Sequence, residues 1–254
     1  MGLMLETQGN VEVQNHGAVR EISLNWPEIR NALGPSQARE LRLAIEAANA
    51  DEDVRAIVIT AKGKAFCSGG NLPEILAVIE AGGAEAIRTA IYGEFQGTMR
   101  AIADSRVPVI AAVDGPAIGL GADIAMAGSV TLVGANGWLA QGWIRAGLIP
   151  ATGGTRYVKQ RGGQQAVFRF LAADKVDGPT AESWGLAIAC DNARDAALEM
   201  AEKFASFSGK ALEAVVQLSR IDDRSAHLDA ALDYQVGFLT HPDFAKATAK
   251  LLGK

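Results

Sequence analysis

One acidic side chain stands alone in a stretch of small and apolar residues. The stretch, PAIGLGADIAMAG from Pro116 to Gly128, has Asp123 as its one charged residue and follows the apolar run VPVIAA. That run predicts a buried strand, and the glycines predict a turn into a helix. A carboxylate in such surroundings costs free energy unless it is paired or used chemically. Asp123 is therefore a candidate proton-transfer group, although a helix dipole also stabilises a purely structural aspartate there.

Two further segments have glycine-rich turns that enter helices. One is KGKAFCSGGNLPEI, from Lys62 to Ile75, and the other is QGWIRAGLIPATGGTRYV, from Gln141 to Val158. Backbone N–H groups at such a turn have no helical partner, so they can hold a developing negative charge. A plain structural turn explains any one of these segments taken alone.

The elements that position these segments alternate between strand and helix. Val11 to Asn25 predicts a hairpin that turns at Asn15-His16-Gly17, and Ser36 to Asn49 predicts an amphipathic helix. Further elements are expected as strands at residues 55–60 and 130–133, one long helix at residues 84–105, and three helical patterns after Ala193. The order predicts an α/β core over residues 1–190 and a helical C-terminal region over residues 191–254.

Composition narrows the class of partner. The chain has 254 residues and a formal net charge of -5, which argues against binding to nucleic acid or to an anionic membrane. Cys67 and Cys190 form no redox or metal motif, and the three scattered histidines have no metal-ligand spacing. The N-terminus lacks a basic signal region, and no apolar run reaches the length of a membrane helix. We expect a cytoplasmic protein with a small-molecule partner and no bound metal.

The motifs together resemble those of the enoyl-CoA hydratase/isomerase, or crotonase, family. They are NAL (Asn31 to Leu33), AFCSGGNLPEI, VPVIAAVDGPAIGLGADIAMAG and GLIPATGGT (Gly147 to Thr155). The resemblance implies a crotonase-like α/β fold of repeated ββα units, with a helical C-terminal trimerisation region. It also implies an acyl-CoA thioester substrate, coenzyme A as part of that substrate and no other cofactor, and assembly as a homotrimer or a dimer of trimers.

In that family two backbone N–H groups polarise the thioester carbonyl, so that an enolate-like intermediate can form. Carried over by motif position, these donors are expected to be the amides of Ser68 and Leu120. Leu120 departs from the glycine common at its position. Because leucine disfavours a positive φ, we expect a negative φ there.

The family's hydratases place two glutamates beside the reacting carbons. The matching positions here are Asp123 and Trp143, and no Asp or Glu occurs between Asp123 and Asp174. Hydration needs one group to activate water and one to deliver a proton, and loss of a positioned donor costs about 10²–10⁴-fold in rate. A single acid suits double-bond isomerisation, although the family's isomerases usually keep the glutamate that Trp143 replaces. Atypical hydration or dehydration, isomerisation and a catalytically silent acyl-CoA binder all stay open.

The resemblance also marks residues for substrate binding. Trp143 is expected to shape the pocket for an aromatic or cyclic acyl group, and Arg30 is a candidate for a coenzyme A phosphate. The full expected set is Arg30, Ala32, Gly69, Gly70, Asn71, Leu72, Gly119 and Trp143. Lys246, Lys250 and Lys254 are weaker candidates for phosphate contacts, and Glu74 is expected to face solvent.

Two other interpretations fail on specific residues. The family's aryl-CoA dehalogenases use a nucleophilic aspartate, and that position is Ala151 here. The pair Gly119 and Gly121 hints at a dinucleotide fingerprint, but Ile124 replaces the third glycine.

Overall fold

The computed structural model describes residues 9–144 and 147–240 of the chain. The strands are β1 (Asn10–His16), β2 (Val19–Asn25), β3 (Ala56–Ala61), β4 (Val109–Val113), β5 (Pro116–Ile118), β6 (Val130–Val133), β7 (Trp138–Ala140), β8 (Val176–Asp177) and β9 (Ile188–Ala189). The helices are η1 (Pro27–Ile29, 3-10), α1 (Pro35–Ala50), α2 (Leu72–Ala86), η2 (Ile87–Ile91, π), α3 (Tyr92–Ala103), α4 (Leu120–Ala127), α5 (Gly154–Ala172), α6 (Gly178–Ser183), α7 (Ala193–Ala205), α8 (Gly209–Leu218) and α9 (Arg224–Thr240). The chain divides into one compact unit that ends at Ala205 and a second that begins at Ser206.

A six-stranded sheet in the order β1-β2-β3-β4-β6-β9 forms the frame of the first unit. β1 and β2 form the predicted antiparallel hairpin, and the other neighbours pair in parallel. Parallel strands are buried on both faces, and β3 shows this directly. Ile57 and Ile59 join one apolar cluster, whereas Ala56 and Val58 join another on the opposite face.

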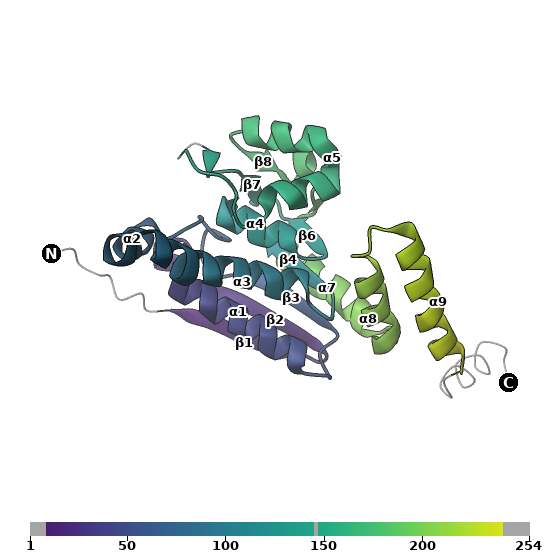
Figure 1. Ribbon diagram of the computed structural model, residues 1–254. Helices are drawn as coiled ribbons and strands as arrows, with labels where there is room; N and C mark the ends of the chain where they lie inside the picture. The colour runs from purple at the N-terminus through teal and green to yellow at the C-terminus, as the bar shows by residue number, and fades with distance from the viewer. Residues whose placement is uncertain (1–8, 145–146, 241–254) are drawn as a thin grey trace. The chain divides into compact units, whose positions relative to one another are not determined.

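Helices cover both faces of this sheet. On one face α1 and α3 run side by side across β1 to β3, as Figure 1 shows. On the other face, Ala193, Ala197 and Ala201 of α7 are fully buried against the cluster that contains Val58. Because α7 packs on β3 and β4, the first unit extends past Cys190, where the sequence placed the end of the core.

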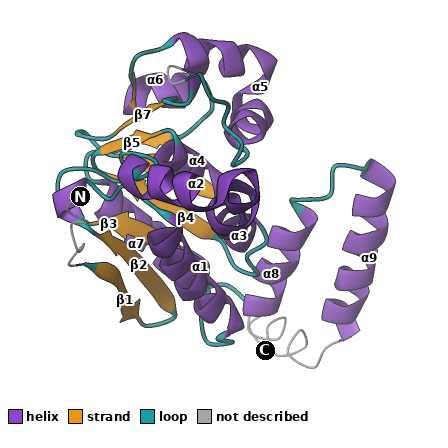
Figure 2. Ribbon diagram, turned by 60° about the vertical axis from the view of Figure 1, so that its left-hand side comes forward, coloured by secondary structure: helices purple, strands orange, loops and turns teal. Residues whose placement is uncertain are grey.

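A second, three-stranded sheet in the order β5-β7-β8 holds the segment around Asp123. β5 pairs in parallel with β7 and lies next to α4 (Figure 2). The Cys67 N–H donates to the Pro116 carbonyl at 3.1 Å, and the Ile118 N–H donates to the Cys67 carbonyl at 2.9 Å. The Ser-Gly-Gly turn after β3 is therefore joined by hydrogen bonds to the strand that leads into α4.

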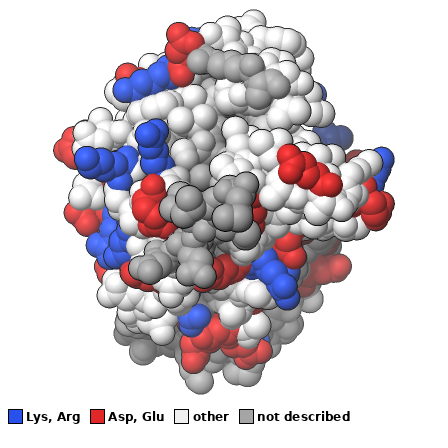
Figure 3. Space-filling model, turned by 90° about the vertical axis from the view of Figure 1, so that its left-hand side faces the viewer, with Lys and Arg blue, Asp and Glu red and all other residues white. Residues whose placement is uncertain are grey.

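The surface agrees with a modest negative net charge. On the face shown in Figure 3, acidic and basic side chains are interspersed. None of the helices in the described part of the chain is long and apolar enough to cross a membrane.

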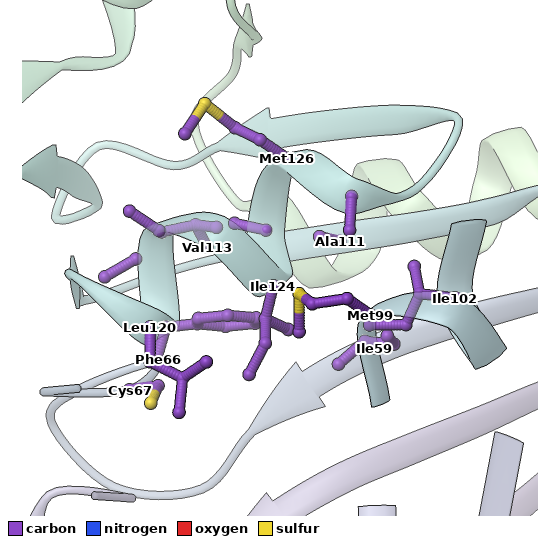
Figure 4. Close-up of a cluster of buried hydrophobic side chains, with 14 of the residues drawn as sticks. Ile59, Phe66, Cys67, Met99, Ile102, Ala111, Val113, Leu120, Ile124 and Met126 are labelled. Atoms are coloured by element: carbon purple, nitrogen blue, oxygen red, sulfur yellow. The ribbon is translucent and has the colours of Figure 1, made fainter. Parts of the chain in front are cut away.

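The helix that carries Asp123 is buried along its whole length. All residues of α4 are buried, so packing fixes it on every side. Figure 4 shows Leu120 and Ile124 of α4 among Phe66, Cys67 and Met99, which come from the loop after β3 and from α3. The position of Asp123 is thus set by the core itself.

Most of the expected elements are confirmed, and one is wrong. The helix expected over residues 84–105 is instead the end of α2, the π-helix η2 and α3. Gly83 interrupts α2 with a φ of 58°, and the buried stripe begins only at Ile91. The apolar periodicity that suggested one helix comes mainly from α3, which packs against α1.

The turn between β2 and α1 depends on one buried amide. Asn31 is fully buried and has a φ of 54°. Its Oδ1 accepts from the Trp26 N–H at 2.8 Å, and its Nδ2 donates to the carbonyls of Lys62 and Ala65 at 2.9 and 2.8 Å. Asn31 therefore holds the NAL segment against the loop that follows β3.

We predict that Asn31→Ala lowers the free energy of unfolding by roughly 2–4 kcal/mol, since it removes three hydrogen bonds to the backbone, two of them to the buried residues Trp26 and Ala65. Alanine also disfavours the left-handed backbone conformation. Urea denaturation of Asn31→Ala and Asn25→Ala tests this, because the Asn25 side chain makes an exposed bond to Glu12. Equal losses in the two variants would contradict the role given to Asn31.

Candidate active site

Asp123 lies in the first turn of α4 and is fully buried. Its Oδ2 accepts a hydrogen bond from Thr152 Oγ1 at 2.5 Å and one from Trp143 Nε1 at 3.3 Å. Its Oδ1 has no hydrogen-bond partner within the described residues. One oxygen of the carboxylate is held in place, and the other is available to a proton.

Burial dominates the acidity of this group. It raises the pKa of Asp123 to about 6, while the polar side chains of Thr152, Trp143 and Gln141, in that order, oppose the rise by stabilising the ionised form. A group with a pKa near the working pH is populated in both protonation states. Asp123 therefore has the acidity that suits a general base and acid.

Two tyrosines interact electrostatically with Asp123. Burial, followed by the charge of Asp123, raises the pKa of Tyr92 from α3 and raises that of Tyr157 from α5 to about 12. Both phenols therefore stay protonated near neutral pH. They add neutral, polar groups to the surroundings of the carboxylate.

Trp143 and Thr152 reach Asp123 from the two ends of one loop. The Leu148 N–H donates to the Trp143 carbonyl at 2.9 Å, and the Gly153 N–H donates to the Pro150 carbonyl at 3.1 Å. Gln96 Nε2 from α3 also donates to the Ala151 carbonyl at 3.0 Å. These bonds hold the loop ends so that both side-chain donors reach the same oxygen.

Gly154, the first residue of α5, makes room for the carboxylate. A Cβ atom at this position would lie 2.0 Å from Asp123 Oδ1, closer than real Cβ contacts come. Only glycine allows α5 to begin this close to Asp123.

The indole of Trp143 lies between two glycine turns. A Cβ on Gly119 would be 3.5 Å from Trp143 Nε1, and a Cβ on Gly70 would be 4.0 Å from the Cη2 atom at the far end of the ring. Trp143 itself is only 9% exposed. The two turns that the sequence singled out therefore meet at one side chain, which also contacts Asp123.

The structure bears on the two predicted amide donors in different ways. Leu120 opens α4, and Gly119 before it has a φ of 54°, so the positive φ falls on the glycine and not on Leu120. The first N–H groups of a helix have no intrahelical acceptor. The Ser68 N–H, by contrast, donates to the Arg30 carbonyl at 3.1 Å, so it is not free, contrary to the prediction.

Gly70 offers a free amide on the same turn. Leu33 and Gly70 form a parallel bridge in which the Leu33 N–H donates to the Gly69 carbonyl and the Asn71 N–H donates to the Leu33 carbonyl. Such a bridge does not use the N–H of Gly70. Within the described residues, the Gly70 amide therefore has no acceptor, in contrast to that of Ser68.

The residues expected to bind coenzyme A lie together. The bonds of Ser68 to Arg30 and of Leu33 to Gly69 join the segment around Ala32 to the glycine turn. Arg30 is exposed, with a φ of 55°, and Leu72 is 62% exposed at the start of α2.

Two further expectations have different outcomes. Glu74 does not simply face solvent, because its Oε1 accepts from Ser36 Oγ at 2.9 Å beside the start of α1. Lys246, Lys250 and Lys254 lie outside the described residues.

Sequence reasoning missed Thr152 and Gly154 as parts of the site. Both lie within the GLIPATGGT motif, whose glycines were read only as a turn. Only the structure identifies them, through their contacts with Asp123. Thr152 and Asp123 are 29 residues apart along the chain.

Comparison with known proteins gives concordant results. Residues 14–247 match the family model described as "Enoyl-CoA hydratase/isomerase". A "probable enoyl-CoA hydratase" of Rhizobium meliloti (strain 1021) is 34% identical over 233 residues, which are 90% of this chain and 84% of that protein. A protein of the same name from Rhodobacter capsulatus is 36% identical over 168 residues, 65% of this chain and 62% of that protein.

Other reaction types and solved structures occur among the similar proteins. The 1,2-epoxyphenylacetyl-CoA isomerase of Escherichia coli (strain K12) is 24% identical over 243 residues, 93% of this chain and 92% of that protein. The crystal structure of an enoyl-CoA hydratase from Polaromonas sp. JS666 has a TM-score of 0.88 and 26% identity, and the match covers 96% of this chain and 97% of that one. The mixed α/β fold predicted from the sequence is confirmed.

The raised pKa of Asp123 has a defined effect on stability. Its carboxyl binds a proton more tightly in the folded protein, with a pKa of about 6, than at its ordinary value of 3.8. Its contribution to stability is therefore complete below about pH 4 and is lost as the pH rises through about 6. We predict that, between pH 4 and pH 7, wild type loses about 2 kcal/mol of stability relative to Asp123→Asn.

Urea denaturation of both proteins at one-unit pH steps measures this difference, and Asp177→Asn is the matched control. The hydrogen bond from Thr180 lowers the pKa of Asp177, so relative to that variant wild type should gain stability as the pH rises. A pH-independent difference for Asp123→Asn would contradict the assignment.

Proposed function

Because the chain belongs to the enoyl-CoA hydratase/isomerase family, we propose that it forms an enolate from an acyl-CoA thioester and that Asp123 transfers the proton. The crotonase-like fold expected from the motifs is confirmed by the structural match. The observation that carries the proposal is the carboxylate of Asp123. It is buried, it has a pKa near neutrality, and it has one unpaired oxygen.

The thioester oxygen is held, in this proposal, by the amides of Gly70 and Leu120. The Gly70 amide has no acceptor within the described residues, and Leu120 is the first residue of α4. The two turns lie on either side of the Trp143 indole. Each such donor typically lowers the barrier by about 2.7–4 kcal/mol, because it stabilises the negative charge that develops on the oxygen.

The proton chemistry follows from a single acid. Oδ1 of Asp123 removes a proton from the α-carbon, and the electron pair moves to the thioester oxygen. For a β,γ-unsaturated chain, return of that proton to the γ-carbon shifts the double bond and leaves Asp123 ionised again. One carboxylate can carry out both proton transfers of this isomerisation, whereas efficient hydration requires a second group to activate water.

Trp143 replaces that second acid and limits hydration. Its Nε1–H donates to Asp123 at 3.3 Å, so it stabilises the ionised base but does not accept a proton from water. Atypical hydration or dehydration therefore remains the slower alternative. The indole offers an apolar face to the acyl group, which favours an aromatic or cyclic chain.

One observation favours a second candidate function, a catalytically silent acyl-CoA binder. Asp123 has no exposed surface, and two donors already occupy its Oδ2. Proton transfer to a substrate therefore requires the substrate to reach Oδ1 past Trp143 or the glycine turns. A protein in which this never happens would keep the thioester site without turnover.

Exchange of the substrate α-proton with deuterated solvent distinguishes the two functions. We predict that a panel of acyl-CoA thioesters, including aryl and cyclic ones, contains at least one that exchanges, measured by mass spectrometry. Asp123→Asn should slow this exchange by about 10²–10⁴-fold, because the proton-transfer group is lost.

The control is Asp177→Asn, whose carboxylate caps α6 away from the site and should leave exchange unchanged. Binding of several thioesters without any exchange would instead identify the silent binder.

We also propose that the second unit mediates self-association. Within α9, four side chains spaced by four, four and three residues are 60%, 63%, 51% and 48% exposed: Leu228, Leu232, Val236 and Leu239. An exposed apolar stripe of this kind is typical of a protein interface. It supports the homotrimer, or dimer of trimers, that the family resemblance implied.

We predict that Leu232→Asp reduces the molar mass in solution from that of an oligomer toward that of a single chain, because it places a charge in the stripe. Light scattering coupled to size-exclusion chromatography measures this. Leu43→Asp is the control, since Leu43 is a 48% exposed leucine of α1. A wild-type protein that runs as a monomer would refute the association.

A further inference from the structure

We propose that Thr152 is a positioning residue that holds Oδ2 of Asp123, so that Oδ1 is the oxygen that exchanges the proton with substrate. The inference rests on the proposed role of Asp123 and adds to it the choice of oxygen and the residue that makes that choice. It begins from the 2.5 Å contact between Thr152 Oγ1 and Asp123 Oδ2.

The direction of this hydrogen bond is fixed by chemistry. An ionised carboxylate only accepts hydrogen bonds, and a threonine hydroxyl has a single proton to donate. Thr152 is buried and its hydroxyl donates to Asp123, so its proton is committed to Oδ2. A hydrogen bond to an ionised acceptor is also stronger than one between neutral groups.

The two oxygens of Asp123 are therefore not equivalent. Oδ2 receives the hydroxyl of Thr152 and the indole N–H of Trp143, whereas Oδ1 has no partner within the described residues. A proton that arrives at Oδ2 would have to displace one of these donors. A proton that arrives at Oδ1 displaces nothing, so Oδ1 is the more basic oxygen.

The surrounding elements reinforce this asymmetry. The backbone of α5 comes so close to Oδ1 that only glycine fits at position 154, which restricts rotation of the carboxylate. Among residues 9–144 and 147–240, the titratable groups that interact with Asp123 from packed elements are Tyr92 of α3 and Tyr157 of α5, and both stay neutral near pH 7. Trp143 and Gln141 complete the set of polar neighbours from the loop.

The test compares two variants of Thr152 with one variant of a second buried threonine, Thr98. Thr152→Val removes the donor at nearly constant volume, and Thr152→Ser keeps the hydroxyl. Thr98→Val is the matched control, because Thr98 is equally buried but donates to the carbonyls of Ala38 and Glu94. Thr152→Ala serves if the valine variant does not fold.

The first measurement is the titration of Asp123, followed by carbon NMR of ¹³C-labelled aspartate carboxyls and assigned with Asp123→Asn. Loss of a donor to the ionised form raises the pKa of a carboxyl, and we expect Thr152→Val to shift the titration upward by about one pH unit. Thr152→Ser and Thr98→Val should titrate like wild type. This measurement does not depend on turnover.

The second measurement is the pH profile of α-proton exchange. In Thr152→Val the acid limb should move upward with the titration, with a lower maximal rate and little change in the apparent affinity for the thioester. In Thr152→Ser the profile should return to that of wild type. A structural role alone would lower the rate equally at every pH, as Thr98→Val does if it destabilises the fold.

The outcomes separate the two proposals. An unshifted titration in Thr152→Val overturns the role of Thr152, whether or not the protein exchanges protons. A shifted titration without exchange by wild type supports the hold of Thr152 on Oδ2 but overturns Oδ1 as the oxygen that exchanges with substrate, along with the proposed function. A shifted titration together with a shifted pH profile supports both.

Discussion

The burial of one carboxylate is the constraint on which the rest of the site depends. Transfer of an ionised carboxylate into an apolar core costs several kcal/mol, and hydrogen bonds to the charged form recover about 1.5–3 kcal/mol each. Thr152 and Trp143 supply such bonds, but not enough to bring the pKa of Asp123 back to its ordinary value. The remaining penalty is what leaves Asp123 able to take up and release a proton near neutrality.

Most of the fold could be predicted from the sequence because the apolar residues that each element buries recur at regular spacing. β3 alternates between two apolar clusters, and the alanines of α7 recur every four residues on the face that packs against the sheet. The same reasoning failed over residues 84–105. There the buried stripe starts only at Ile91, the last residue of η2, and continues along α3, and the apolar period reveals neither the break at Gly83 nor the π-turns of η2.

The sequence predicts those residues of the candidate site whose place follows from their position within a motif. Asp123 and Trp143 were found because motif positions fix which residue types face each other, and their hydrogen bond agrees with that. On the first turn, the proposed donor is the amide of Gly70, two residues after the predicted Ser68, whose N–H donates to Arg30. In a regular extended chain the N–H groups of Ser68 and Gly70, two residues apart, would point the same way. Gly69 between them has a φ of 111°, so the backbone turns there, and only the Ser68 N–H meets a carbonyl, that of Arg30. Thr152 was not predicted, because its hydrogen bond to Asp123 joins residues 29 apart in the chain and depends on how the fold brings them together.

Trp143, which stands at the position of the family's second acid, and Thr152 have the same effect on Asp123, because both donate a hydrogen bond to its Oδ2. A second carboxylate at position 143 would repel Asp123 and couple the two titrations, so that a proton would be shared between them. An indole N–H does the opposite, since it stabilises the ionised form of the acid that remains. The shorter stem of aspartate, compared with glutamate, keeps this acid within reach of Thr152 and against Gly154. In the proposed function, one acid with two hydrogen-bond donors on Oδ2 takes the place of the family's pair of acids, an arrangement suited to moving a single proton.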